Sequence, residues 1–124
     1  MFSSTKYTLH APPADFRAIK SLIAAEYNGI AVTVPEFDPV VASSLSPSGK
    51  VPVLETGSGV IFESNAIARY IAKTRRDTGL TGDGSALEEG VVDSWIDFAS
   101  NALELPACIW WYPTANKLPF QKLS

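Results

Sequence analysis

The 124-residue sequence contains a single cysteine, Cys108, so it cannot form an internal disulfide. It has no Cys-x-x-Cys pair either, which excludes a bare thioredoxin-like redox site. Its net charge of −3 gives no reason to expect nucleic-acid binding through a basic surface. No apolar run approaches the length that crosses a bilayer, and the residues after Met1 lack the pattern of a signal peptide. We therefore expect a cytoplasmic protein that contacts neither nucleic acid nor membrane directly.

Hydrophobic residues make up 46% of the sequence and charged residues 19%, a composition that supports a buried core and argues against disorder. The length suffices for one modest domain, or for one domain and the beginning of another. Neither an internal repeat nor a low-complexity tract occurs. The organisation of the chain must therefore be inferred from its local patterns.

The first part of the chain predicts a strand, a helix and a second strand. Residues 6–10 alternate and are rich in β-forming side chains; Pro12 and Pro13 end this strand because proline lacks a backbone donor. Residues 30–34 are β-branched in large part and are stopped by Pro35. The connection between the two strands is long enough for a crossover, so they can pair in parallel.

The helix between these strands is defined by large apolar residues at helical spacing. Asp15 suits the positive N-terminal end of the helix, and Asn28 with Gly29 suits a left-handed cap at its C-terminal end. The apolar positions are Phe16, Ile19, Leu22, Ile23 and Tyr27.

The middle of the chain predicts a β-hairpin that leads into another helix. Residues 40–45 precede it and can form a short, irregular helix among nearby prolines. Two short apolar runs then flank a turn at residues 56–59, and the pair Val51-Pro52 opens the first run. The hairpin is thus the second strand pair that the sequence predicts.

The helix after the hairpin begins at the pair Glu63-Ser64. Ser64 is a favourable N-cap residue, and an apolar stripe follows it. Basic residues gather at the C-terminal end, where the helix dipole favours cations. The stripe consists of Ile67, Ala68, Ile71 and Ala72, and the basic residues are Lys73, Arg75 and Arg76.

The glycine-rich residues 78–85 predict a linker and a domain boundary. Beyond them, apolar positions over residues 87–103 predict a long amphipathic helix that Pro106 ends. Residues 107–113 form an apolar and aromatic segment, and residues 118–124 resemble the lead-in to further structure. Because a helix and an aromatic segment cannot bury this surface alone, we expect a truncated second domain.

The predicted order β-α-β-α-β-β-α resembles the thioredoxin-like N-terminal domain of glutathione transferases. In that domain a Val-Pro pair opens the third strand and a Glu-Ser pair opens the third helix, as Val51-Pro52 and Glu63-Ser64 do here. The stretches that carry the resemblance are residues 22–29, 49–53, 62–68, 95–99 and 110–113.

The resemblance implies an α/β fold. We expect a thioredoxin-like βαβαββα domain with a mixed four-stranded sheet over residues 1–77, followed by the linker at residues 78–85. Residues 86–124 would then be the beginning of the all-α C-terminal domain of a glutathione transferase, truncated before its remaining helices.

The resemblance also implies a site for glutathione, as ligand or cosubstrate, and no metal. Ser64 would bind the γ-glutamyl carboxylate with its N–H and hydroxyl, and Glu63 would help to hold that end of the ligand. Val51, if its bond to Pro52 is cis, would pair its backbone with the ligand, and Lys50 would meet the glycine carboxylate. The alternatives are that Ser64 only caps its helix, that Pro52 only shapes the strand, and that Lys50 is a solvated surface charge.

Thiol activation is where the sequence departs from the family. Its enzymes place a tyrosine, serine or cysteine near the first strand or helix to hydrogen-bond the glutathione thiolate. The tyrosine-type position falls at about Leu9 and the serine-type position at about Pro13, and neither side chain can donate. His10 is the candidate catalytic residue that remains, although a structural role suits a lone histidine there. Cys108 is either a buried small hydrophobe or a reactive thiol.

Two functions follow from the resemblance. In one branch of the family the domain is a binding and scaffolding module that anchors the nucleotide-exchange complex of translation elongation, with the exchange subunit and other subunits as partners. The alternative is an active glutathione transferase that conjugates glutathione to small electrophiles. A homodimer is compatible with both. The aromatic residues Trp110, Trp111 and Tyr112 could line a pocket for the electrophile, but core packing or a subunit interface is the simpler interpretation.

Overall fold

The computed structural model describes residues 6–115. The chain forms two compact units, residues 1–83 and residues 84–124, and each is described by itself. Among the described residues, no helix is both long enough and apolar enough to cross a membrane.

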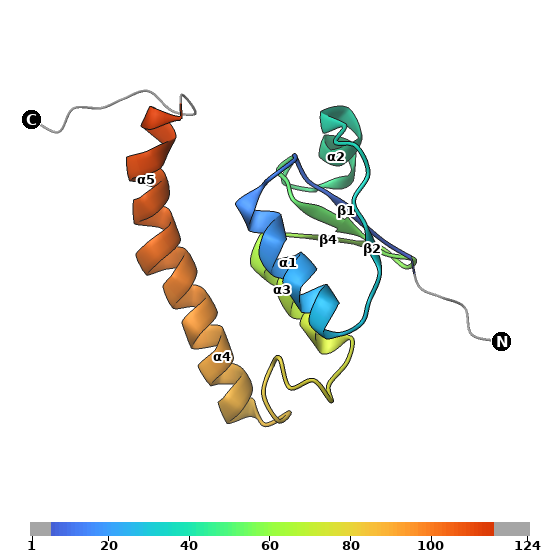
Figure 1. Ribbon diagram of the computed structural model, residues 1–124, viewed down its shortest axis with the longest axis vertical. Helices are drawn as coiled ribbons and strands as arrows, with labels where there is room; N and C mark the ends of the chain where they lie inside the picture. The colour runs from blue at the N-terminus through green and yellow to red at the C-terminus, as the bar shows by residue number, and fades with distance from the viewer. Residues whose placement is uncertain (1–5, 116–124) are drawn as a thin grey trace, which may run out of the picture. The chain divides into compact units, whose positions relative to one another are not determined.

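The first unit is built on a four-stranded sheet (Figure 1). Its strands are β1 (Tyr7–His10), β2 (Val32–Thr33), β3 (Val53–Glu55) and β4 (Val60–Phe62), in the order β2-β1-β3-β4. β1 pairs with β2 in parallel, whereas the pairs β1–β3 and β3–β4 are antiparallel. The predicted mixed sheet and the predicted hairpin are therefore confirmed.

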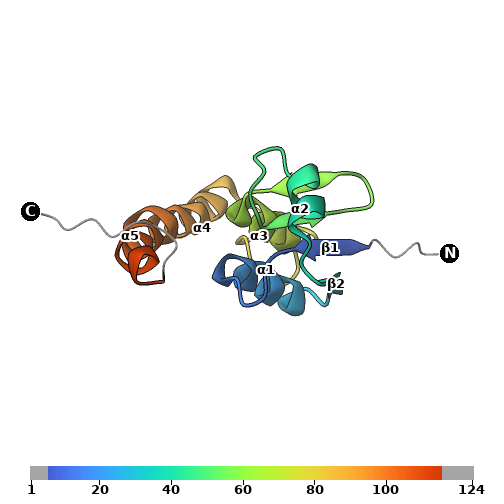
Figure 2. The same cartoon turned by 90° about the horizontal axis from the view of Figure 1, so that it is seen from above.

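Three helices complete this unit: α1 (Phe16–Tyr27), α2 (Pro39–Leu45) and α3 (Ser64–Lys73). α1 and α3 lie together on one side of the sheet and α2 lies on the other (Figure 1). Figure 2 shows the same neighbouring placement of α1 and α3 from above. The observed order β-α-β-α-β-β-α is the thioredoxin-like order that the sequence predicts.

Local signals in the sequence explain where these helices begin and end. Asp15 caps α1 by accepting a hydrogen bond from the N–H of Arg17 at 3.0 Å. Asp38 caps α2 in the same way, accepting from the N–H of Val40 at 2.9 Å. Gly29 follows α1 with a φ of 64°, the left-handed conformation that glycine adopts without a Cβ clash.

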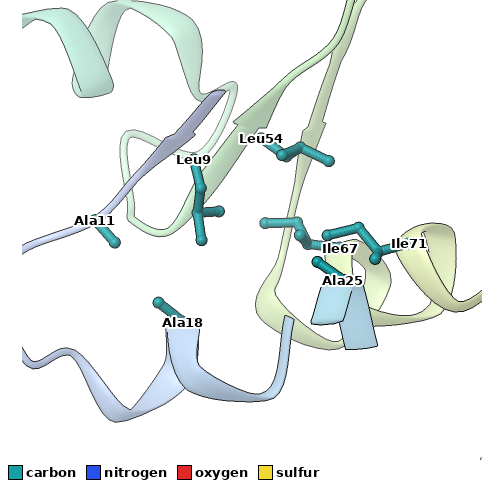
Figure 3. Packing of buried hydrophobic residues seen from close by; sticks show 7 residues of the cluster. All are labelled: Leu9, Ala11, Ala18, Ala25, Leu54, Ile67 and Ile71. Carbon is teal, nitrogen blue, oxygen red and sulfur yellow. The ribbon is translucent and has the colours of Figure 1, made fainter. Parts of the chain in front are cut away.

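The core of the unit lies between the sheet and the helix pair (Figure 3). Leu9 of β1 and Leu54 of β3 face Ile67 and Ile71 of α3, and all four side chains are completely buried. Two small side chains of α1, Ala18 near its start and Ala25 near its end, pack beside them. The buried members of this cluster are Leu9, Ala11, Ala18, Ala25, Leu54, Ile67 and Ile71.

The residues of α1 that signal a helix in the sequence are mostly not the ones it buries. Phe16, Ile19, Ile23 and Tyr27 are 40%, 49%, 52% and 67% exposed, whereas the small side chains Ala18, Ser21 and Ala25 are buried. Small side chains let α1 approach α3 closely, so the buried face is the small-residue face. Helical spacing thus predicted the helix but not its buried face.

The second unit is a helical stretch that changes its hydrogen-bond register. α4 (Ala86–Phe98) is followed by a π-helical segment, η1 (Ala99–Glu104), and then by α5 (Leu105–Thr114). Ser85 caps α4 by accepting from the N–H of Glu88 at 3.2 Å.

The prediction that Pro106 ends the helix is wrong, because the helical path continues through it. The N–H of Leu105 bonds to the carbonyl of Ser100, five residues back, so the register shifts and α5 begins there. Pro106 then lies in the first turn of α5, where its missing N–H costs little. The predicted aromatic segment is α5 itself, and the predicted lead-in at residues 118–124 lies outside the described residues.

A buried amide ties the C-terminal ends of α1 and α3 together. Asn28 is 3% exposed, and its Nδ2 donates to the carbonyls of Ile71 at 2.8 Å and Ala72 at 3.2 Å. Its Oδ1 accepts from the hydroxyl of Thr78 at 2.5 Å. The Ile71 carbonyl also accepts from the N–H of Thr74 at 3.2 Å and from its hydroxyl at 2.6 Å, so Asn28 adds a donor from outside the helix to the end of α3.

We predict that Asn28→Ala lowers the free energy of unfolding by about 2 kcal/mol, because it removes a buried side chain and the hydrogen bonds by which it joins α1 to α3. Urea denaturation measures this change. Asn101→Ala, at an exposed position of η1, is the matched control and should change it by less than about 0.5 kcal/mol. An Asn28→Ala protein as stable as the control would show that the amide does not carry the link between α1 and α3.

Candidate functional site

The strand register brings three chain segments to one end of the sheet. His10 of β1 lies opposite Val53 of β3, and Val53 lies opposite Phe62 of β4. The chain leaves β1 at this row, enters β3 at it and leaves β4 at it. Three segments therefore lie at this same end of the sheet: the loop before α1, the pair Val51-Pro52 and the pair Glu63-Ser64.

The segment that enters β3 has the backbone form that the resemblance implies. The Val51–Pro52 peptide bond is cis, and the Pro52 side chain is buried. Val51 is half-buried, and Lys50 before it is exposed. The backbone N–H of Lys50 donates to the hydroxyl of Ser48 at 3.3 Å.

The prediction that Ser64 is the N-cap of α3 is wrong. Ser64 is the first helical residue, and Glu63 occupies the cap position, where its carbonyl accepts the N–H of Ile67 at 3.0 Å. Glu63 has a φ of 73° and makes no side-chain capping bond. The chain turns into the helix through the left-handed conformation of Glu63, without a capping side chain. Ser64 therefore occupies the position after the cap.

This start leaves an anion-binding group of donors. The N–H groups of Ser64 and Ala66 lie ahead of the first helical bond, which runs from the N–H of Ile67 to the carbonyl of Glu63, so they have no acceptor within α3. Among the described residues the Ser64 hydroxyl also makes no hydrogen bond. Free N–H groups at the positive end of a helix dipole suit a carboxylate or phosphate.

Leu9 and Pro13, near which we expect the thiol-activating positions of the family, have side chains that cannot donate. Leu9 is completely buried in the core cluster, between the sheet and the helix pair. Pro13 is exposed in the turn between β1 and α1, beside Ala14, which has a φ of 57°. A leucine in the core and a proline in a turn can stabilise the fold but cannot hydrogen-bond a thiolate.

His10 lies on the other face of the sheet from Leu9, because side chains alternate along a strand. Its ring is buried, and Nε2 lies 3.1 Å from Oε1 of Glu55 in the neighbouring strand β3. Leu9 faces α3 in the core, so His10 faces away from the helix whose N-terminus lies at the shared edge. The structure thus gives the imidazole a partner within the sheet.

Tyr7 of β1 contacts Tyr70 of α3. The two rings are perpendicular in the manner of an edge contact, with centroids 6.2 Å apart. Burial raises the pKa of the Tyr70 phenol, and a hydrogen bond and charge repulsion from Tyr7 raise it further. The Tyr70 phenol therefore stays neutral at physiological pH. The contact between the two rings packs β1 against α3.

The remaining candidates lie in the second unit. Cys108 of α5 is buried, as a small apolar side chain would be. Trp110 is 75% exposed and Trp111 is 41% exposed. Within residues 6–115, no group of three or more histidine, cysteine, aspartate and glutamate side chains could hold a metal ion.

The structure adds two residues to the candidate site that the sequence did not indicate. The ammonium of Lys20 on α1 donates to Oδ1 of Asn65, the second residue of α3, at 2.5 Å. They are 45 residues apart, so no local spacing relates them. The one signal in the sequence is that Asn65 directly follows Ser64.

Comparison with known proteins agrees with this geometry. The profile of the family described as "Glutathione S-transferase, N-terminal domain" matches residues 5–73. The chain is 42% identical over 112 residues to elongation factor 1-gamma of Prunus avium, covering 85% of this chain and 26% of that protein. It is also 42% identical over 121 residues to a probable elongation factor 1-gamma 1 of Arabidopsis thaliana, covering 90% and 28%. The chain therefore spans less than a third of these relatives, and the resemblance to their branch of the family is confirmed.

A solved structure shows the same fold. The theta class glutathione S-transferase of Xanthomonas axonopodis pv. citri, solved with glutathione bound, matches with a TM-score of 0.72 at 26% identity. The match covers 85% of this chain and 54% of that one. The predicted glutathione transferase-like fold is thereby confirmed.

The corrected start of α3 generates a stability prediction. Ser64→Ala should change the free energy of unfolding by less than about 0.5 kcal/mol, because the hydroxyl caps nothing. Asp15→Ala is the matched comparison and should cost about 1 kcal/mol, because Asp15 does cap α1. Urea denaturation of both variants provides the measurement. A larger loss for Ser64→Ala than for Asp15→Ala would restore the capping role to Ser64.

Proposed function

The chain belongs to the glutathione S-transferase family through its N-terminal domain, and from this premise we propose that it is the transferase-like module of an elongation factor 1-gamma subunit. In this role it anchors the nucleotide-exchange complex of translation elongation and leaves nucleotide exchange to a partner subunit. Its partners are the other elongation factor 1 subunits, and a second copy of the chain is a further candidate. A cytoplasmic location follows from this role.

One observation carries the choice of a scaffold over an enzyme. Leu9 stands at the tyrosine-type position, and its side chain is completely buried in the core. A transferase depends on lowering the pKa of the glutathione thiol, and that requires a donor beside the sulfur. A buried leucine supplies none, and Pro13 at the serine-type position supplies none either.

The glutathione site itself is a separate part of the proposal. Ser64 would bind the γ-glutamyl carboxylate through its free N–H and hydroxyl, with Glu63 beside it. Val51, before the buried Pro52, would pair its backbone with the ligand as an added strand, and the exposed Lys50 would meet the glycine carboxylate. The register that places these segments on one edge of the sheet supports this assignment.

The alternative is an active glutathione transferase that conjugates glutathione to small electrophiles. The cis Val51–Pro52 bond and the donors at the start of α3 favour it, and His10 would then have to donate to the thiolate. The contact of His10 with Glu55 on the face away from α3 argues against that task. We therefore place the scaffold first. In either case we propose that the thioredoxin-like domain spans residues 1–77, the linker residues 78–85 and the helical domain residues from 86 onward.

We predict that the chain co-elutes with the nucleotide-exchange subunit of elongation factor 1 in size-exclusion chromatography.

We also predict that the chain conjugates glutathione to a generic aromatic electrophile, such as chlorodinitrobenzene, only slowly, because no donor lowers the pKa of the thiol. The absorbance of the thioether product measures the rate of this conjugation. Robust turnover that His10→Ala abolishes would overturn the scaffold assignment and establish the enzyme.

We further predict that Ser64→Ala weakens retention on immobilised glutathione by roughly tenfold, because it removes a hydrogen bond to a charged group. Ser58→Ala, in the exposed hairpin turn, is the matched control and should be retained like the unsubstituted chain. Since Ser64 caps nothing, the loss should occur without a loss of stability. Unchanged retention of Ser64→Ala would remove its hydroxyl from the site.

A further inference from the structure

We propose that Asn28-Gly29 is a modification site: a spontaneous deamidation site that the fold keeps closed and that opens only when the C-terminal ends of α1 and α3 separate. The site uses the amide that links the two helices, at the end of α3 opposite to the candidate binding site. The inference does not depend on the proposed function.

The sequence contains one asparagine that is followed by glycine, Asn28. Deamidation begins when the backbone nitrogen of the next residue attacks Cγ of the asparagine. Glycine is the most reactive next residue, because it has no Cβ to hinder the attack and its backbone rotates most freely. The other asparagines are Asn65, Asn101 and Asn116, and alanine or lysine follows them.

The reaction consumes water and needs no other reagent. The Gly29 nitrogen loses its proton and forms a bond to Cγ of Asn28, and the side-chain nitrogen leaves with a proton as ammonia. Water then opens the cyclic imide and leaves aspartate or isoaspartate at position 28. Nothing is oxidised or reduced.

The folded backbone holds the attacking nitrogen in a hydrogen bond. The N–H of Gly29 donates to the carbonyl of Glu26 at 3.2 Å. The N–H groups on either side of it also bond back into α1, from Asn28 at 3.1 Å and from Ile30 at 2.9 Å. The Gly29 nitrogen therefore cannot turn towards Cγ while the end of α1 is intact.

The folded side chain holds the attacked carbon in place as well. Asn28 is 3% exposed, its Nδ2 donates to the Ile71 and Ala72 carbonyls, and its Oδ1 accepts from the Thr78 hydroxyl. All three contacts come from α3 or from the segment that follows it. The reaction therefore requires a local opening that separates this end of α1 from α3.

The product cannot restore the link between the helices. Aspartate lacks the Nδ2 donor, so its carboxylate would face the carbonyl oxygens of Ile71 and Ala72 in a buried place. Acceptors that face one another without a proton repel, and burial denies them water. Isoaspartate also adds a methylene to the backbone between α1 and β2. One transient opening is thereby converted into a permanent weakening of the contact between α1 and α3.

The test follows the masses of proteolytic peptides after incubation of the whole chain at mildly alkaline pH, in buffer and in urea above the unfolding midpoint. In urea, Asn28 should be deamidated before the other asparagines. In buffer, Asn28 should react at least about a hundredfold more slowly than in urea, because only the open fraction reacts.

Thr78→Val tests the gate, because it removes the hydroxyl that donates to Oδ1 of Asn28 at 2.5 Å and keeps the shape of the side chain. It should raise the rate at Asn28 in buffer by roughly three- to tenfold and leave the rate in urea unchanged. Thr114→Val is the matched control, since it removes an exposed hydroxyl that donates to a carbonyl within α5, and it should change neither rate.

Chain that is deamidated in urea and then refolded should unfold at a lower urea concentration than chain that has kept its amide, and so should Asn28→Asp. Equal rates at Asn28 in buffer and in urea would overturn the inference, as would faster reaction of another asparagine in urea. It also fails if Thr78→Val reacts no faster in buffer than Thr114→Val. Deamidated chain that unfolds at the same urea concentration as intact chain would overturn it too.

Discussion

The antiparallel pairing of β1 with β3 is the constraint on which the rest of the first unit depends. It sets Leu9 opposite Leu54, and these two side chains form the floor of the core beneath α1 and α3. The same register sets His10 opposite Val53, which fixes where the chain enters β3. A slip of one residue would exchange the two faces of the strand and remove the core and the shared edge together.

The contact between α1 and α3 is the second constraint. Small side chains on α1 let the two helices approach, and polar contacts hold both ends of the pair. Asn28 satisfies carbonyls at the C-terminal end of α3, and Lys20 contacts Asn65 at its N-terminal end. The helix whose N-terminus forms the candidate site is therefore held at both ends by α1, which is how a binding geometry can be kept rigid.

Binding and thiol chemistry depend on different parts of this fold. The donors at the start of α3 come from backbone geometry, which survives as long as Glu63 takes its left-handed turn. Thiol activation needs one particular side chain at the end of β1, and there the chain has a core leucine and a histidine engaged by Glu55. Under the proposed function, the domain would bind the ligand at the start of α3 without a side chain that activates the thiol.

The sequence by itself determined the order of elements, the caps at Asp15 and Gly29 and the hairpin, because these depend on residues close together in the chain. Only the tertiary structure decided which face of α1 is buried, since that depends on how closely α3 can approach. Only the structure shows that Glu63, rather than Ser64, is the cap residue of α3. Only the structure shows that the helix continues through Pro106, because the hydrogen-bond register shifts just before it. The Lys20–Asn65 contact could not be read from the sequence at all, since folding alone brings residues 45 positions apart together.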